Sequence, residues 1–232
     1  KGEEAILILE PGTASSVTSP VHVAGLADPT FEQSLVIQVT GADGSLIVNF
    51  PVQINADVGQ RGPFEADVPF GVSFDEPGRL SVYSTSARDG GLIHLASVEV
   101  TLLAGGAPAI NPAQPHKESI AIREPQPQAT IGSGPLHLAG FSEYVFENVL
   151  NVALCGAGGS GPADILCGTT DNAIAAGIAT VHSPDMGQPG PFDGDLTFSV
   201  TGGFTTRVIV YSTSTRDGGI THISSVEVNV TP

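Results

Sequence analysis

Four of the six histidines could take part in acid–base or metal chemistry, because they recur in pairs along the chain. The pairs are His22 with His137, and His94 with His222. Each lies in a stretch that alternates apolar and polar residues, where a polar side chain faces away from the core. No Asp or Glu pattern around them forms a triad or a ligand set. The sequence therefore predicts structural histidines, with no catalytic residue, metal site or cofactor.

The two cysteines, Cys155 and Cys167, offer the second kind of chemistry. Cys155 ends an apolar run and Cys167 follows Leu166, so a hairpin would bring the two thiols opposite one another. We expect a disulfide, as is usual in exported proteins. Closing so short a loop would stabilise the fold by roughly 3 kcal/mol. Two free buried thiols are the alternative, and two cysteines without nearby ligands fall short of a zinc set.

Acidic residues gather in several loops, where they could hold calcium or hydrolyse glycosides. They are Asp75, Glu76, Asp164, Asp171, Asp185, Asp193 and Asp195. None of these segments matches the calcium loop D-x-[DN]-x-[DN]-G, and calcium binding stays open. The chain has no Trp and three Tyr, so it lacks the aromatic platforms that usually stack on sugars. Carbohydrate binding is thereby disfavoured but not excluded, and a glycan or protein ligand remains an alternative.

Residues 88–91 and 216–219 both read Arg-Asp-Gly-Gly. Asp-Gly and Gly-Gly supply the positive φ that tight hairpin turns require. Turn chemistry explains the copied motif, and we assign it no further role.

The chain contains one module written twice. The segment Val82–Leu102 recurs as Val210–Val230 at a spacing of 128 residues, whereas His22–Gly25 recurs as His137–Gly140 at a spacing of 115. The second copy therefore carries about 13 extra residues, and both cysteines lie in this insertion.

We expect three parts from this repeat: a module over residues 1–102, a linker rich in Pro, Gly and Ala over 103–116, and a second module over 117–232. Two modules of roughly 100 residues are the natural division of a chain of this length. A linker of this composition builds no strand ladder and tends to stay extended. It should hold the two modules apart.

Within each copy the local pattern is β throughout. Leu35–Val39 and Leu46–Val48 flank a Gly-rich turn, which is a hairpin pattern. Leu80–Ser84 alternates, crosses the turn at residues 88–91 and resumes at Leu92. Short strands at this spacing, without a helical period, predict an all-β sandwich or barrel.

The order of landmarks resembles a known family. A strand ends in Glu-Pro (residues 10–11 and 124–125), and then come residues 19–25, Phe31-Glu32, Gly62–Phe64 and the closing hairpin. The pattern resembles the immunoglobulin-like domain of bacterial spore germination proteins, over nearly all of both copies. This resemblance implies two tandem immunoglobulin-like β-sandwiches, an accessory role in envelope or extracellular proteins, and no catalytic residues.

The charge balance excludes several partners. Asp and Glu number 24 against 8 Lys and Arg, a net charge of −16. Nucleic acids and anionic lipid surfaces attract basic patches, so neither is an expected partner. No apolar stretch is long enough to predict membrane insertion. We expect an exported protein, extracellular or on the cell surface, with any signal peptide outside this numbering.

Three classes of function remain for a chain with these features. A missing nucleophile–base pair, metal set and cofactor loop argue against an enzyme. The favoured function is a non-enzymatic structural protein, a self-associating subunit of a surface filament, fibre or matrix. The alternative is a cell-surface binding or adhesion module that recognises glycan, peptidoglycan or a protein partner.

Self-association is expected through the N-terminal strand, formed by Ala5, Ile6, Leu7, Ile8 and Leu9. If Ile6 and Ile8 fill inward positions, Leu7 and Leu9 point outward. An apolar edge strand without a blunting charge or proline pairs readily with another chain. Either the second module or a neighbouring subunit could cover it. We expect the neighbour, and hence a homo-oligomer or polymer.

Overall fold

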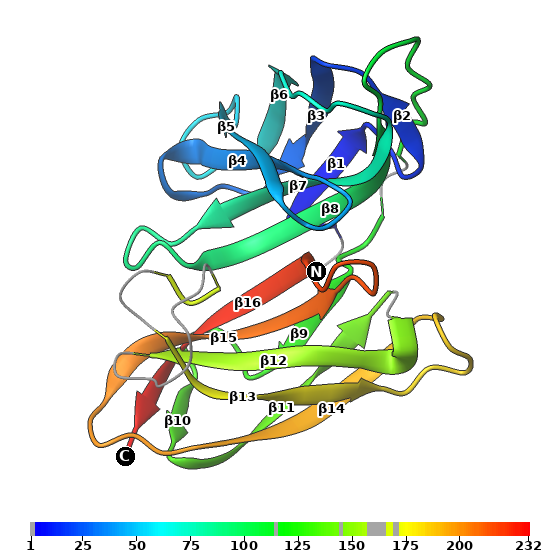
Figure 1. Cartoon of the computed structure of the whole chain (residues 1–232). Coiled ribbons are helices and arrows are strands. Elements are labelled where there is room, and N and C mark those ends of the chain that lie inside the picture. The colour runs from blue at the N-terminus through cyan, green and yellow to red at the C-terminus, as the bar shows by residue number, and fades with distance from the viewer. Residues whose placement is uncertain (1–2, 114–115, 144–145, 157–165, 169–171) are drawn as a thin grey trace.

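The protein is almost entirely β-structure. The structure, a computed structural model, describes residues 3–113, 116–143, 146–156, 166–168 and 172–232. Within these ranges sixteen strands and two short 3-10 segments form two β-sandwiches, stacked one above the other in Figure 1. The predicted fold class, all-β with two tandem immunoglobulin-like sandwiches, is confirmed. The described residues include no helix of the length and apolarity needed to cross a bilayer.

The first sandwich places the sheet β1-β3-β6 against the sheet β5-β4-β7-β8. Its core lies between the two sheets and includes Leu35, Ile37, Phe64 and Leu80. Alternation explains the pattern, because Leu35, Ile37 and Val39 are buried whereas the residues between them are half-buried. The strands are β1 (Ile6–Glu10), β2 (Ser15–Val17), β3 (Val21–Ala27), β4 (Ser34–Thr40), β5 (Leu46–Gln53), β6 (Gly62–Val68), β7 (Glu76–Thr85) and β8 (Leu92–Leu102), with the 3-10 segment η1 (Phe31–Gln33) before β4.

The second sandwich repeats this plan with one difference. Strand β13 pairs with β12 along its length and also with β14 at Thr180 and Val181, so its sheet continues round one side. Its separate core includes Leu138, Leu150, Phe192 and Val208. The strands are β9 (Ile120–Glu124), β10 (Thr130–Gly132), β11 (Gly134–Ser142), β12 (Val149–Gly156), β13 (Asn172–Val181), β14 (Gly190–Phe198), β15 (Phe204–Thr213) and β16 (Ile220–Thr231), with η2 (Phe146–Asn148) before β12.

The two sandwiches pack directly on each other. Strand β8 of the first pairs antiparallel with β16 of the second, at Leu95 with Ile223 and at Ala96 with His222. The interface between the two modules is here called the seam, and a third apolar cluster lies within it. This cluster consists of Tyr83, Leu92, Leu95, Ala153, Cys155, Leu166, Cys167, Ile209 and Ile223. Strands β7, β8, β12, β15 and β16 therefore bury both faces, one in their own core and one in the seam.

The expectation that the linker holds the modules apart is wrong. The chain after β8 turns back along the first module, where Ala109 bridges to Ser16 and the Ala113 N–H donates to the Leu9 carbonyl at 3.0 Å. Linker composition prevents a long ladder but does not oppose docking. Burying the apolar outer faces of the two modules against each other lowers the free energy of the folded protein, because it removes apolar surface from water.

The N-terminal strand β1 agrees with the expectation in part. Ile6 and Ile8 enter the first core, as predicted. Leu7 does not face water: its side chain is 3% exposed within this single chain, and Leu9 is half-buried. The outward leucines that motivated self-association are thus largely covered without a second subunit. Self-association itself stays a prediction.

Candidate functional site

The seam carries two reciprocal ion pairs. Arg79 in β7 donates to both oxygens of Asp217, at 2.9 and 3.1 Å, in the turn between β15 and β16. Arg207 in β15 donates to both oxygens of Asp89, at 2.7 and 2.8 Å, in the turn between β7 and β8. Both arginines and both aspartates are buried. Arg207 is the repeat equivalent of Arg79, and Asp217 is the repeat equivalent of Asp89. The two ion pairs are therefore related by a pseudo-twofold axis between the modules.

The copied turn sequence places each aspartate. Gly90 and Gly218 adopt the positive φ values of 75° and 71° that the turn needs. Oδ1 of Asp89 accepts the Gly91 N–H at 2.9 Å, and Oδ1 of Asp217 accepts the equivalent Gly219 N–H at 2.9 Å. This local bond fixes the carboxylate so that its edge faces the arginine of the other module.

The second glycine of each motif makes room for that arginine. A Cβ at Gly91 would lie within contact distance of Arg207 and 2.7 Å from the backbone of Cys167. A Cβ at Gly219 would meet Arg79 in the same way. The motif therefore does more than form a turn, and the interpretation that turn chemistry alone explains it is incomplete.

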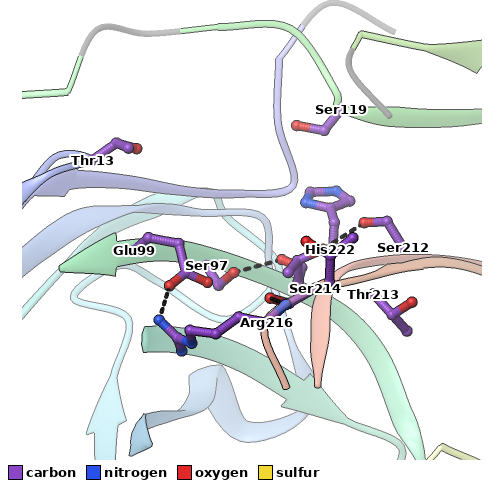
Figure 2. A pocket seen from close by; sticks show the side chains of 11 residues that line it. Thr13, Ser97, Glu99, Ser119, Ser212, Thr213, Ser214, Arg216 and His222 are labelled. Carbon is purple, nitrogen blue, oxygen red and sulfur yellow. Dashed lines mark hydrogen bonds and ion pairs between the residues drawn. The ribbon is translucent and has the colours of Figure 1, made fainter. Parts of the chain in front are cut away.

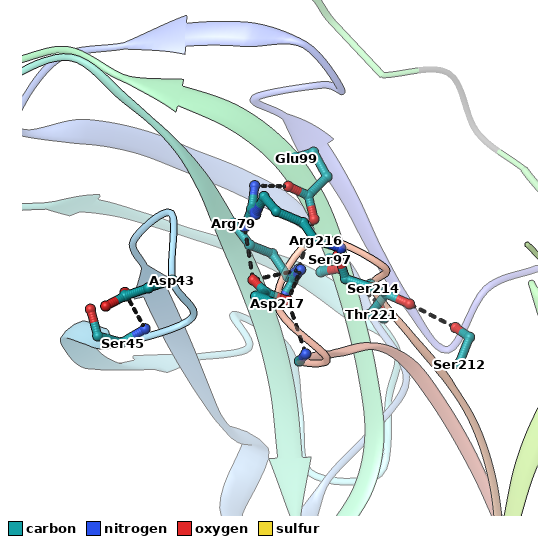
Figure 3. A network of polar contacts seen from close by, with 11 residues as sticks. Asp43, Ser45, Arg79, Ser97, Glu99, Ser212, Ser214, Arg216, Asp217 and Thr221 are labelled. Atoms are coloured by element: carbon teal, nitrogen blue, oxygen red, sulfur yellow. Dashed lines mark hydrogen bonds and ion pairs between the residues drawn. The ribbon is translucent and has the colours of Figure 1, made fainter.

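Further charges extend each pair into a network. Arg216 contacts Asp217 at 3.0 Å, and Glu99 accepts from Arg79 at 2.8 Å, as Figure 3 shows. On the other side, Arg88 contacts Asp89 at 3.0 Å and approaches Glu227 at 3.6 Å.

The networks keep both aspartates ionised. Burial alone would raise the pKa of Asp89, but the hydrogen bonds from Arg207 and Gly91, with the Arg207 charge, lower it to about 2. Burial likewise opposes ionisation of Asp217, yet the bonds from Arg79, Gly219 and Arg216 lower its pKa to about 2. Each ion pair therefore stays charged at all ordinary pH values.

A second reciprocal contact closes one end of the seam. Ser119, at the start of the second module, donates its N–H and its Oγ–H to Oε2 of Glu4, both at 2.8 Å. The Ala5 N–H of the first module donates to Oε2 of Glu118 at 3.1 Å. Each module thus anchors the other's first strand with a buried glutamate.

His222 joins this end of the seam from β16. Its Nε2 lies 3.0 Å from Oε1 of Glu4. Burial acts to raise the pKa of Glu4, but the charge and hydrogen bond of His222 and the bonds from Ser119 outweigh it and lower the pKa.

The insertion of the second module completes the seam. Cys155 and Cys167 are bonded to each other, as the sequence predicts, with their Cα atoms 5.4 Å apart. The bond holds Leu166 and Cys167 in the seam, and Gly168 forms a β-bridge with Gly90 of the first module. The rest of the insertion, residues 157–165 and 169–171, lies outside the described residues.

A cavity of about 500 Å³ opens beside this contact. Figure 2 shows His222 projecting toward Ser119, with Ser97, Glu99 and Arg216 on the neighbouring wall. Hydroxyl groups from residues 212–215 and 221 line the remainder. Glu118 and His94 line a second cavity of about 350 Å³.

The recurring histidines divide into two kinds. His22 contacts Asp67 at 2.9 Å and His137 contacts Asp195 at 3.0 Å, both on exposed strand faces. The hydrogen bond to Asp195 raises the pKa of His137. His94 and His222 also face away from their own cores, as expected, but what they face is the other module.

The loop carboxylates do not gather into one described site. Asp193 pairs with His182 at 2.8 Å, and Asp75 accepts the N–H of Ala104 at 2.8 Å. Asp164 and Asp171 lie outside the described residues. Asp89, Asp217, Glu4 and Glu118 are buried carboxylates that instead join the two modules.

One sequence signal could have revealed the ion pairs. Arg207 precedes the continuous apolar run Val208–Tyr211, whereas a half-buried strand would alternate. A run of this kind indicates a strand buried on both faces. Both copies carry an arginine at this position and an aspartate 10 residues later. If the second face of the strand is buried against the other module, each arginine can pair with the aspartate of that module.

Comparison with known proteins agrees with this architecture. Residues 5–91 match the family model described as the immunoglobulin-like domain of bacterial spore germination. The match lies within the first module. The resemblance predicted from the sequence is confirmed, and the internal repeat extends the same domain plan to the second module. Such domains are generally non-catalytic.

The solved structures that match the chain share little sequence with it. The titin domains z1z2 in complex with telethonin are 14% identical with a TM-score of 0.20, and the match covers 100% of this chain and 98% of that one. CBD12 from CALX1.2 is 11% identical with a TM-score of 0.22, covering 97% and 99%. The enterotoxigenic E. coli adhesin CfaE is 10% identical with a TM-score of 0.20, covering 100% and 84%. Similarity at this level carries no information on ligand or partner. A search of curated proteins finds no match.

Proposed function

We propose that the protein is a non-enzymatic, exported structural protein whose two immunoglobulin-like modules work as one rigid unit in an extracellular assembly. The observation that carries this proposal is the reciprocal pairing of Arg79 with Asp217 and Arg207 with Asp89 across a buried seam. Flexible tandem modules need no such contact. A disulfide and a net charge of −16 are consistent with an exported, highly soluble protein.

The arrangement at His222 supports the absence of catalysis. Ser, His and Glu side chains meet there, as in a catalytic triad, but in the wrong order. Ser119 Oγ and His222 Nε2 both contact Glu4. A triad needs the histidine between the nucleophile and the carboxylate, so that it can accept the nucleophile's proton.

Location and assembly can be tested on native material. Immunogold electron microscopy with antibodies against the full chain should label the cell surface and any filaments or matrix on it. Label confined to the cytoplasm would contradict the proposal.

Self-association through Ala5–Leu9 belongs to the same proposal and has its own test. Light scattering of the full chain should show a mass that rises with concentration, and Leu9→Lys should abolish the rise. Leu9 is the suitable position because it is half-buried, whereas Leu7 is buried. Ile178→Lys, on the exposed face of β13, is the control. A monomer at all concentrations would exclude a polymer formed through this strand.

The cavity beside His222 favours a second candidate function, ligand binding. Its hydroxyls, Arg216 and Glu99 suit a polar molecule such as a glycan. Ser214→Tyr should fill the cavity and weaken binding to peptidoglycan fragments, measured by calorimetry. Equal binding by both proteins would place any glycan site elsewhere.

A further inference from the structure

Three ligating side chains from three distant segments meet where the seam closes. They are Glu4 before β1, Glu118 before β9 and His222 in β16. The side chains are almost completely covered, with residue exposures of 2%, 7% and 8%. One oxygen or nitrogen atom from each lies within 4.8 Å of the others. In the described part of the chain, this is the one set of three such residues with that proximity.

The charges of this group differ from those of the Arg–Asp pairs. Asp89 and Asp217 each meet a permanently charged guanidinium group. In the described residues, the ion-pair partners of Glu4 are histidines: His222 at 3.0 Å and His116 at 3.5 Å. A bound divalent cation would balance the charge of both buried carboxylates.

Hydrogen bonds already orient the carboxylates. Oε2 of Glu4 is held by the N–H and Oγ–H of Ser119, which directs Oε1 toward His222. Oε2 of Glu118 is held by the N–H of Ala5. Such bonds to ligating carboxylates are a regular part of metal sites, because they fix each oxygen in place.

We propose that Glu4, Glu118 and His222 bind a divalent transition-metal ion, with zinc as the first candidate. Imidazole nitrogen and carboxylate oxygen are zinc ligands with bonds of about 2.0–2.2 Å, which places tetrahedral ligands about 3.3 Å apart. The 3.0 Å between Glu4 and His222 already approaches this spacing. Calcium needs six to eight oxygens and fits less well.

The cavity beside His222 would give the ion an entry path and room for a fourth ligand. His222 and Ser119 form part of its wall (Figure 2), so a water molecule or a ligand group can reach the metal from that side. The bound ion would join the first strands of both modules to β16. Zinc would therefore lock the seam as well as neutralise it.

Calorimetric titration of the full, metal-free chain with zinc chloride tests the proposal. One ion should bind per chain. At a hundredfold excess over Kd, the melting temperature should rise by roughly 5–10 °C. Glu118→Gln and His222→Gln should each weaken binding at least tenfold and remove the rise. Glu118→Gln keeps the side-chain size and an acceptor for Ala5, so it should fold. Calcium chloride should bind far more weakly than zinc.

His182→Gln is the matched control, because it removes an exposed His–Asp contact and leaves the seam intact. Cobalt adds a measurement that needs no variant, since tetrahedral cobalt in the wild-type protein should give intense visible absorption. The proposal is overturned if zinc does not bind, if His182→Gln abolishes binding, or if Glu118→Gln and His222→Gln bind zinc as the wild type does.

Discussion

At the scale of single residues, the ion pairs between the modules fix a geometry as well as balancing charge. A buried ion pair often adds little net stability, because removing two charges from water is costly. Here each aspartate is fixed by its own turn and each arginine donates to both carboxylate oxygens. The pairs are therefore best regarded as devices that specify one arrangement of the modules, and breaking one leaves an uncompensated buried charge.

Acid should weaken the protein through these two aspartates. Their pKa falls from 3.8 in the unfolded chain to about 2 in the folded protein. Their contribution is therefore complete above about pH 4 and is lost as the pH falls through about 2. The linkage amounts to roughly 2 kcal/mol for each group. Urea unfolding measured between pH 5 and pH 2 should show this decline.

Asp217→Asn isolates the effect. The amide oxygen can still accept the Gly219 N–H, but it cannot balance the charge of Arg79. The variant should be less stable at pH 7 by about 3 kcal/mol and show a smaller decline in acid than the wild type. Asp67→Asn, at an exposed His–Asp contact, should change little. Parallel pH curves for Asp217→Asn and wild type would contradict the assignment.

At the scale of elements, the insertion makes the two halves of the seam unequal. The turn of the first module meets Cys167 and Gly168, which the disulfide holds in place. The turn of the second module meets Gly44 of the first, in the turn between β4 and β5. The disulfide thus fixes the segment that packs against the turn of Asp89, whereas the turn of Asp217 has no such support.

Reducing the disulfide should therefore affect the two turns differently. Stability should fall by roughly 3 kcal/mol, as expected for a loop of this length. Hydrogen exchange of the Gly91 amide should accelerate, because the segment covering its turn is released. The Gly219 amide makes the same bond to its own aspartate and serves as the internal control. Equal acceleration at both glycines would show that the disulfide acts on the whole fold and not on one side of the seam.

At the scale of the whole molecule, two separate cores are joined by a third apolar cluster. Strands β7 and β15 belong to a sandwich core on one face and to the seam on the other. Loss of one module would expose apolar surface on its partner, so the stability of each module depends on the other.

The full chain should therefore unfold in one calorimetric transition. Leu95→Lys would put a charge into the seam without entering either core, and should split the transition into two or lower it by several degrees. Ile178→Lys adds the same charge at an exposed position and should leave one transition. Two transitions in the wild type would contradict the picture of one rigid unit.

The sequence by itself determined the strands, the turns, the repeat and the disulfide. These follow from local rules: alternation, positive φ at Asp-Gly and Gly-Gly, and two cysteines in an inserted segment. It also placed Ile6 and Ile8 in the core. Only the tertiary structure decided that Leu7 is covered, that Asp89 pairs with Arg207, and that Glu4 meets His222. The partners of Asp89 and Glu4 lie more than 100 residues away along the chain, and no local pattern encodes the docking of one module on another. That docking is decided by the burial of two apolar faces whose fit exists only once both sandwiches have formed.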